Sequence, residues 1–123
     1  MTVPLVNADD VRPTVGDVAL IERTRCRSDA GEEFDTFNDD TSPTYDEVCS
    51  LIDLAVIEVL GQLPDAIDPA LYPAVTRLIV LRTSILVELS FFRVQATEGP
   101  MAALTAMFLS DLKSLAALPV RLV

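Results

Sequence analysis

The residues of this chain that could do chemistry form one basic cluster followed by one long acidic block. Residues 23–27, Arg-Thr-Arg-Cys-Arg, place three arginines around a thiol. Such a cluster could bind a phosphate group, or lower the pKa of Cys26 until it becomes a reactive thiolate. It could equally be a basic helix end that favours the helix dipole and pairs with the acidic residues after it. Residues 28–68 contain twelve acidic residues and no basic one, so the sequence leaves both interpretations open.

Complete catalytic and metal-binding patterns are missing from the sequence. The chain has no histidine, so no imidazole can activate a serine or cysteine nucleophile. Residues 35–46 fail the pattern of a calcium loop, because Phe37, Asp40 and Asp46 stand where that loop needs a ligand, a glycine and a glutamate. The four glycines lie too far apart for a phosphate-binding loop. We therefore expect no enzymatic activity, no metal site and no cofactor.

Length and charge limit the class of protein further. The chain has 123 residues, half of them hydrophobic, which is typical of one globular domain. Its net charge of −10 argues against general DNA binding, because that requires basic residues to displace the counterions of phosphates. No uncharged apolar run reaches 18 residues and the first residues lack a signal-peptide pattern, so we expect no membrane partner. Cys26 and Cys49 are too few for a disulfide scaffold and are expected to be reduced.

Helix start signals recur along the chain and predict a small all-α four-helix bundle. Thr14, with Asp17 three residues later, predicts a short helix that ends near residue 23. Thr44 and Glu47 form a capping box that predicts the start of a second helix, and Gly61 predicts its end. An acidic loop, pinned by its few large apolar side chains, would connect these two helices.

The second half of the chain contains two longer predicted helices. Proline in the first turn after Asp68 starts a helix expected over residues 69–95, and Gly99-Pro100 precedes another over residues 101–117. The single domain, residues 1–123, would therefore consist of three parts. These are an extended arm over 1–12, a helical bundle over 13–118 and a C-terminal arm over 119–123.

The predicted helix over residues 69–95 carries apolar side chains on two opposite sides. The larger face comprises Leu71, Val75, Leu78, Ile79, Ile85, Leu86, Leu89 and Phe92, and the smaller stripe comprises Val80, Val87 and Phe91. A surface helix of a small monomer needs only one apolar face. This helix is therefore either central in its own bundle or held between its bundle and a partner. Arg82, within the larger face, either extends along the helix to solvent or forms an ion pair across a subunit interface. The candidates for a subunit interface are accordingly Val80, Arg82, Val87 and Phe91.

The order of these elements resembles one protein family. Residues 11–14 (VRPT) lead into a short helix, an acidic loop follows, and residues 41–48 (TSPTYDEV) lead to residues 51–56 (LIDLAV). This pattern resembles the head-to-tail adaptors, or connectors, of long-tailed phages, particularly phages of actinobacterial hosts. Residues 86–92 (LVELSFF) look like the third helix of that family. The resemblance covers roughly residues 11–119.

The resemblance implies a structural virion protein and not an enzyme. Such adaptors form a homo-oligomeric ring, a dodecamer, under the portal protein at the head–tail neck, and are assembled in the host cytoplasm. The ring continues the DNA channel, through which the genome passes without specific binding, and presents a platform for the stopper or another tail protein. The candidates for the channel-facing or partner-facing surface are Asp29, Glu32, Glu33, Asp35, Asp39 and Asp40. The candidates for docking on the portal are Val120, Arg121, Leu122 and Val123.

A function of another class remains open. A small acidic inhibitor or antitoxin that mimics nucleic acid would use the same acidic block, residues 28–68, to occupy a basic cleft. The neighbouring genes would discriminate between the two functions. An adaptor gene is expected between portal and capsid genes on one side and stopper and tail genes on the other.

Overall fold

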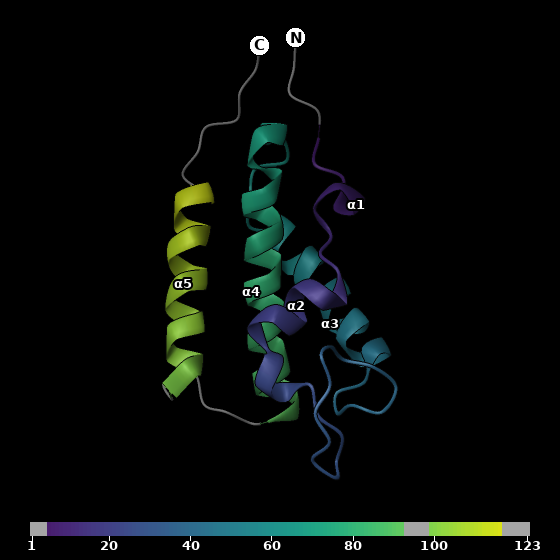
Figure 1. The fold of residues 1–123 in the computed structure, drawn as a ribbon. Coiled ribbons are helices and arrows are strands. Elements are labelled where there is room, and N and C mark those ends of the chain that lie inside the picture. Colours follow the sequence, from purple (N-terminus) through teal and green to yellow (C-terminus); the bar gives the residue numbers. More distant parts are fainter. Residues whose placement is uncertain (1–4, 93–98, 117–123) are drawn as a thin grey trace.

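Helix α4 (Tyr72–Phe91) lies at the centre of the bundle, as Figure 1 shows for the computed structural model, which describes residues 5–92 and 99–116. Helix α3 (Tyr45–Leu60) packs along one side of α4, and helix α5 (Gly99–Ala116) packs along the opposite side. The short helix α2 (Val15–Ile21) contacts both α3 and α4. Among the described residues there are isolated β-bridges but no strands. The predicted all-α four-helix bundle is therefore confirmed.

Two helices begin where local sequence predicted them. The hydroxyl of Thr14 accepts a hydrogen bond from the Asp17 amide at 3.2 Å, and the Asp17 carboxylate accepts one from the Thr14 amide at 2.9 Å. The same reciprocal pair joins Thr44 and Glu47 at the start of α3. Helix α3 ends at Gly61, as expected. Helix α2 ends slightly earlier than predicted and is followed by a 3-10 turn, η1 (Arg23–Arg25).

The segment before α2 is not the extended arm that the sequence predicted over residues 1–12. Residues Ala8–Val11 form a one-turn helix, α1, whose first turn is capped by the side chain of Asn7. The Val11 side chain is fully buried in the core, and the Val6 amide donates a hydrogen bond to the Asp65 carbonyl at 2.9 Å. A helix of four residues is too short to show a hydrophobic period, and it is stabilised by packing on α3 and α4. Residues 1–4 lie outside the described part of the chain.

Helix α4 is preceded by a short 3-10 turn, η2 (Pro69–Leu71), where the Asp68 carboxylate accepts a hydrogen bond from the Ala70 amide. A helical segment therefore begins directly after Asp68, as the sequence predicted. Regular α-helix ends at Phe91, and the extension expected to residue 95 falls on residues 93–98, outside the described part.

The two apolar stripes of α4 are mostly covered within the chain, although Leu89 on the larger face is 42% exposed. Leu78 and Ile79 on the larger face are fully buried, and so is Val87 on the smaller stripe, while Val80 is 6% exposed. The reason is that α3, α5 and the α1–α2 region pack around α4 from different directions. Of the two explanations for the stripes, the structure supports a central helix. Val87, which is fully buried, is therefore not available for the subunit interface that the sequence predicted, whereas Val80 lines an open groove and Phe91 is half-buried.

The position of α4 at the centre of the bundle is relevant to the expectation that the chain has no membrane partner. By length and composition the stretch Pro69–Phe91 could cross a membrane, although 56% of its most apolar window is buried inside the bundle. Such burial is typical of a core helix in a small domain.

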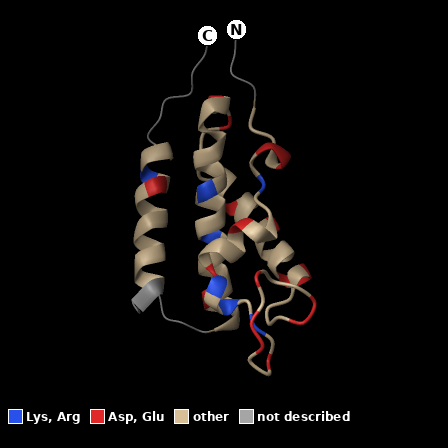
Figure 2. Ribbon diagram, viewed as in Figure 1, with Lys and Arg blue, Asp and Glu red and all other residues tan. Residues whose placement is uncertain are grey.

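Helix α5 packs against the core along one side. Met101, Phe108 and Leu115 are buried, and they recur at seven-residue intervals along one side of the helix. On its outer side, Met107 and Leu109 are 41% and 57% exposed. Lys113 and Asp111 are the charged residues of α5 (Figure 2), so its outer face is nearly neutral.

Candidate interaction surfaces

The acidic loop between α2 and α3 is anchored to the bundle by apolar and polar contacts. The Phe37 side chain is fully buried in the core, as predicted for a residue that pins the loop. Thr41 is buried as well, and its hydroxyl, a single donor, lies within hydrogen-bond distance of the carbonyl oxygens of Pro43 at 2.7 Å and Asn38 at 2.9 Å. The Asn38 side chain accepts hydrogen bonds from the amides of Asp40 and Thr41. The loop is therefore held in a defined conformation by its small polar residues.

The first part of the loop forms a tight reversal next to η1. The Phe34 amide donates to the Cys26 carbonyl at 2.9 Å, and the Ser28 amide donates to the Glu32 carbonyl at 2.9 Å. Gly31 has a φ of 88°, in the left-handed region that favours glycine, and makes the turn possible. This reversal places the acidic side chains at its tip, away from the core.

All six acidic candidates of the loop are exposed. Figure 2 shows the acidic residues of the loop as red segments at one end of the molecule. Two of them form ion pairs with the basic cluster: Arg23 with Asp35 at 2.8 Å, and Arg27 with Glu33 at 2.7 Å. The other four have no ion-pair partner in the part of the chain that the structure describes; they are Asp29, Glu32, Asp39 and Asp40. The arginine cluster thus pairs with the acidic stretch, as its simpler interpretation predicted.

Cys26 does not have the environment of a reactive thiol. Its side chain is fully buried, and the sulfur lies 3.6 Å from the Glu22 carbonyl oxygen, to which it can donate a hydrogen bond. Burial raises the pKa of the Cys26 thiol, and the partly opposing effect of Arg23 is smaller. The hypothesis that the arginines make Cys26 a thiolate is therefore contradicted.

The remaining arginine of the cluster, Arg25, belongs to a buried group of charged residues that the sequence analysis missed. Arg25 donates two hydrogen bonds to the Glu88 carboxylate, at 2.7 Å and 3.0 Å, and its guanidinium lies 3.9 Å from the centre of the Phe92 ring. Glu22 is 5% exposed, and its Oε1 has no hydrogen-bond partner among the described residues. Burial, and secondarily the neighbouring Glu88 carboxylate, raises the pKa of Glu22 from 4.5 to about 8. Near neutral pH the Glu22 side chain therefore keeps its proton beside the Arg25–Glu88 pair.

The signal that could have revealed this group is the position of Glu88. It is the lone acidic residue in the apolar part of α4, between Val87 and Leu89. A buried carboxylate needs a cationic partner, so its presence indicates an arginine nearby in space. The partner lies 63 residues earlier in the chain, however, and nothing local specifies which arginine it is.

Arg82 is paired within its own chain. Its Nε lies 2.5 Å from a carboxylate oxygen of Glu58 on α3, and its guanidinium lies 5.9 Å from the centre of the Phe108 ring on α5. About a quarter of the Arg82 side chain remains exposed. The sequence left open whether Arg82 extends to solvent or pairs across a subunit interface; the structure corrects both by placing its ion-pair partner, Glu58, in the same bundle.

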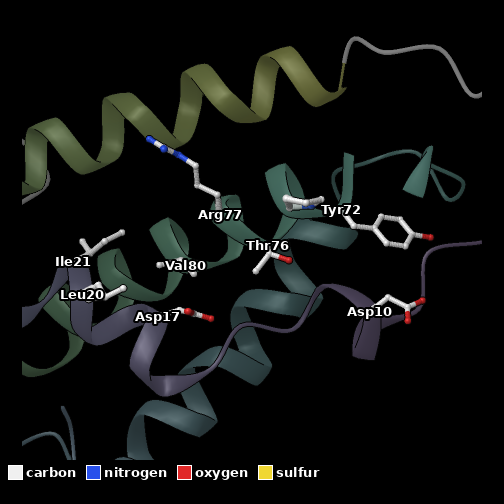
Figure 3. Close-up of a pocket in the computed structure, with 9 residues that line it drawn as sticks. Asp10, Asp17, Leu20, Ile21, Tyr72, Thr76, Arg77 and Val80 are labelled. Atoms are coloured by element: carbon white, nitrogen blue, oxygen red, sulfur yellow. The ribbon is translucent and has the colours of Figure 1, made fainter. Parts of the chain in front are cut away.

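An open groove of about 510 Å³ lies on the surface of the bundle, between α2 and the first turns of α4. Figure 3 shows Leu20, Ile21 and Asp17 from α2 on one side, with Val80 and Thr76 of α4 between them and Arg77. Arg77 extends toward α5, where its Nε lies 3.4 Å from the Asp111 carboxylate. Leu20 is 75% exposed, so this groove contains the most exposed large apolar side chain among those described.

Two other predictions concern the C-terminal segment and metal binding. The segment Val120, Arg121, Leu122 and Val123, predicted to dock on the portal, lies outside the described residues. Over the described ranges, no group of three or more Cys, Asp or Glu side chains is arranged to hold a metal ion.

Comparison with known proteins does not assign the chain to a family. No family model matches it, and neither the curated proteins nor the solved structures include one with significant similarity to it.

Proposed function

We propose that this chain is a structural subunit of a phage neck: an adaptor whose copies form a ring, a dodecamer, between the portal protein and the stopper or tail. The resemblance of its element order to the head-to-tail adaptors suggests this role. The observation that carries it is the acidic loop, an anchored segment whose six carboxylates are all exposed. The architecture is compatible, since the family pattern expects an all-α bundle with this loop between its first two main helices.

The charge of the loop suits a channel through which DNA must slide. Several copies in a ring would repeat the exposed carboxylates around the axis, and the summed negative potential would repel phosphates. Repulsion keeps the duplex from adhering to the wall during packaging and ejection. In this arrangement genomic DNA is cargo and not a specific ligand.

A second candidate function uses the same feature. An acidic inhibitor that mimics nucleic acid would present the loop carboxylates to a basic cleft of a nuclease or DNA-binding protein. The exposed carboxylates without a basic partner in the described chain favour this candidate as well, since Asp29, Glu32, Asp39 and Asp40 are free to pair with a partner's cations.

Co-expression with a portal protein from the same genome tests the adaptor directly. We expect the full chain to co-purify with portal rings and to add a layer of density below them in electron micrographs. A version without residues 119–123 should stay helical by circular dichroism but lose portal binding, while removal of residues 1–4 serves as the control. Failure of the full chain to bind portal would overturn the adaptor, and capture of a basic nuclease in its place would support the inhibitor. Portal binding by the chain without residues 119–123 would mean that another segment docks, such as the one before Pro13.

Charge reversal in the loop tests its proposed position. The double variant Asp29→Lys with Glu32→Lys changes two exposed carboxylates that make no ion pair with a described residue. In assembled particles it should cause salt-sensitive retention of DNA, because new cations on the channel wall bind phosphates. The matched control is Asp9→Lys with Asp65→Lys, two exposed acids near α1. Equal DNA retention by both variants would indicate that the loop does not line the channel.

A further inference from the structure

The outward face of α3 carries two aliphatic side chains that the described part of the chain leaves uncovered. Leu54 and Ile57 lie one turn apart and are 43% and 71% exposed. They point away from the core, in which Ile52 and Val59 of the same helix are buried. Neighbouring exposed aliphatic side chains are typical of a surface that contacts another protein.

The outward face of α5 is apolar as well, and nearly free of charge. Met107 and Leu109 are 41% and 57% exposed, and Ala106 and Ser110 are the exposed residues next to them. Residues 99–110 contain no charged residue at all. A helix side that faces only water normally carries charged and polar residues. The outward side of α5 is therefore a second candidate contact surface.

These two faces lie on different sides of the molecule. Helices α3 and α5 pack on opposite sides of α4 and make no contact with each other (Figure 1). One copy can therefore contact a second copy through α5 while its α3 stays available to a third. A contact between two different surfaces of this kind builds rings or filaments, whereas a contact between two like surfaces closes a dimer.

The α3 side of the molecule is negatively charged. Helix α3 contains four acidic residues and no basic one. Two of the four form ion pairs with arginines of the same chain. The carboxylates of Asp46 and Glu47 have no ion-pair partner among the described residues, although Glu47 also caps the start of the helix. Two α3 faces would therefore repel each other.

The α5 side has the opposite sign. Asp111 lies 3.4 Å from Arg77 of α4, so the exposed Lys113 is the charge on α5 that has no ion-pair partner in the described chain. Opposite charges attract across an α3–α5 contact, and this contact covers the exposed aliphatic side chains of both helices. A contact between two α5 faces would leave Leu54 and Ile57 of both copies in water. Charge and apolar surface together thus select α3 of a second copy as the occupant of the α5 face.

We propose that the outward face of α5 in one copy packs against the outward face of α3 in a second copy. Met107 and Leu109 contact Leu54 and Ile57, and Lys113 lies near the acidic side of α3. The inference rests on the proposed function, because it names the contact between neighbouring copies of the ring. One helix of each copy buries less than the roughly 800 Å² per partner of a stable complex, so the contact is weak in the free chain.

Disulfide trapping between single-cysteine variants of the full chain tests the proposal without any portal protein. Ile57→Cys and Met107→Cys, each in a Cys49→Ser background, are mixed in equal amounts at high protein concentration and oxidised with copper phenanthroline. The mixed dimer should form about tenfold faster than either homodimer, a modest preference in binding free energy. Intact mass distinguishes the three products. The matched control replaces Met107→Cys with Leu20→Cys, because Leu20 is 75% exposed but lies on α2, and it should show no such preference.

Other products of the trapping would overturn the proposal. A Met107→Cys homodimer as the main product would mean that two α5 faces meet, and an Ile57→Cys homodimer would mean that two α3 faces meet. A mixed dimer that forms no faster than in the Leu20→Cys control would mean that a second copy does not occupy the α5 face. Because these reactions use the free chain, their failure differs from a failure to bind portal, which would overturn the adaptor and leave the contact in place.

A charge exchange tests the electrostatic part of the contact. In the Met107→Cys chain, Lys113→Glu should slow formation of the mixed dimer about two- to five-fold, the range expected for exposed charges. Lys113→Arg keeps the charge and is the control, which should leave the rate unchanged. Equal rates for the two variants would overturn the charge complementarity that selects α3 as the partner surface.

Discussion

Replacing Glu22 with glutamine should stabilise this protein increasingly as the pH rises from 5 to 8. Glu22 is 5% exposed and lies against the Arg25–Glu88 ion pair. Its pKa is about 8 in the folded chain and 4.5 when unperturbed, which is the value expected after unfolding. Between these values the unfolded chain has released the proton and the folded chain has kept it. Stability that is fully present below pH 4.5 is therefore lost as the pH rises toward 8.

The size of the effect follows from the difference between the two pKa values. Each pH unit in this window removes about 1.4 kcal/mol from the free energy of unfolding. At pH 7, which is 2.5 units above the unperturbed value, the buried carboxyl of Glu22 costs at most about 3 kcal/mol. Glutamine has nearly the same shape and cannot ionise, so Glu22→Gln should recover most of that amount at pH 7 and almost none near pH 4.5.

Urea denaturation of both proteins at several pH values between 5 and 8 measures this difference. Comparing variant with wild type at each pH cancels the titration of the other carboxylates. Glu32→Gln, an exposed position in the acidic loop, is the control and should give a difference that does not change with pH. A Glu22→Gln difference that stays constant across this range, or decreases with pH, would refute a protonated Glu22 in the folded chain.

Three further predictions concern other parts of the bundle. Because Arg82 and Glu58 are both partly exposed, a double-mutant cycle with Arg82→Met and Glu58→Gln should give a coupling of about 0.2–1 kcal/mol in the isolated chain; no coupling there would reopen a pair between subunits. Phe37→Ala should lower the free energy of unfolding by about 3–5 kcal/mol, because the ring fills the core beneath the acidic loop; a loss below 1 kcal/mol would contradict that anchoring. Cys49 should react with a thiol reagent well before Cys26, whose burial also raises its pKa, and the opposite order in a kinetic assay would contradict the buried thiol.

Local sequence was sufficient for most helix boundaries. The capping boxes at Thr14 and Thr44 involve groups within three residues of each other, so their hydrogen bonds can be predicted without knowledge of the tertiary structure. The inward residues of α5 were also predictable, because a seven-residue apolar spacing keeps them on one side of a helix. The short helix α1 was missed because four residues are too few to show a hydrophobic period.

The candidate surfaces were predictable only in part. Exposure of the acidic loop follows from its composition, because isolated carboxylates are rarely buried. The ion pairs Arg23–Asp35 and Arg27–Glu33 were foreseen only as a general pairing of the arginines with the acidic stretch. The groove beside Leu20 left no signal of its own, since it is formed by residues of α1, α2 and α4.

Composition and local pattern by themselves indicated the fold class, the helix starts and the segment of the chain that carries the acidic charge. Tertiary structure alone decided the role of α4, because the same two apolar stripes fit either a central helix or an interface helix. It also decided the partners of the buried charges, joining Arg25 to Glu88 and Arg82 to Glu58. The physical reason is range: capping and periodicity act over a few residues, whereas burial and ion pairing depend on which distant segments the folded core brings together.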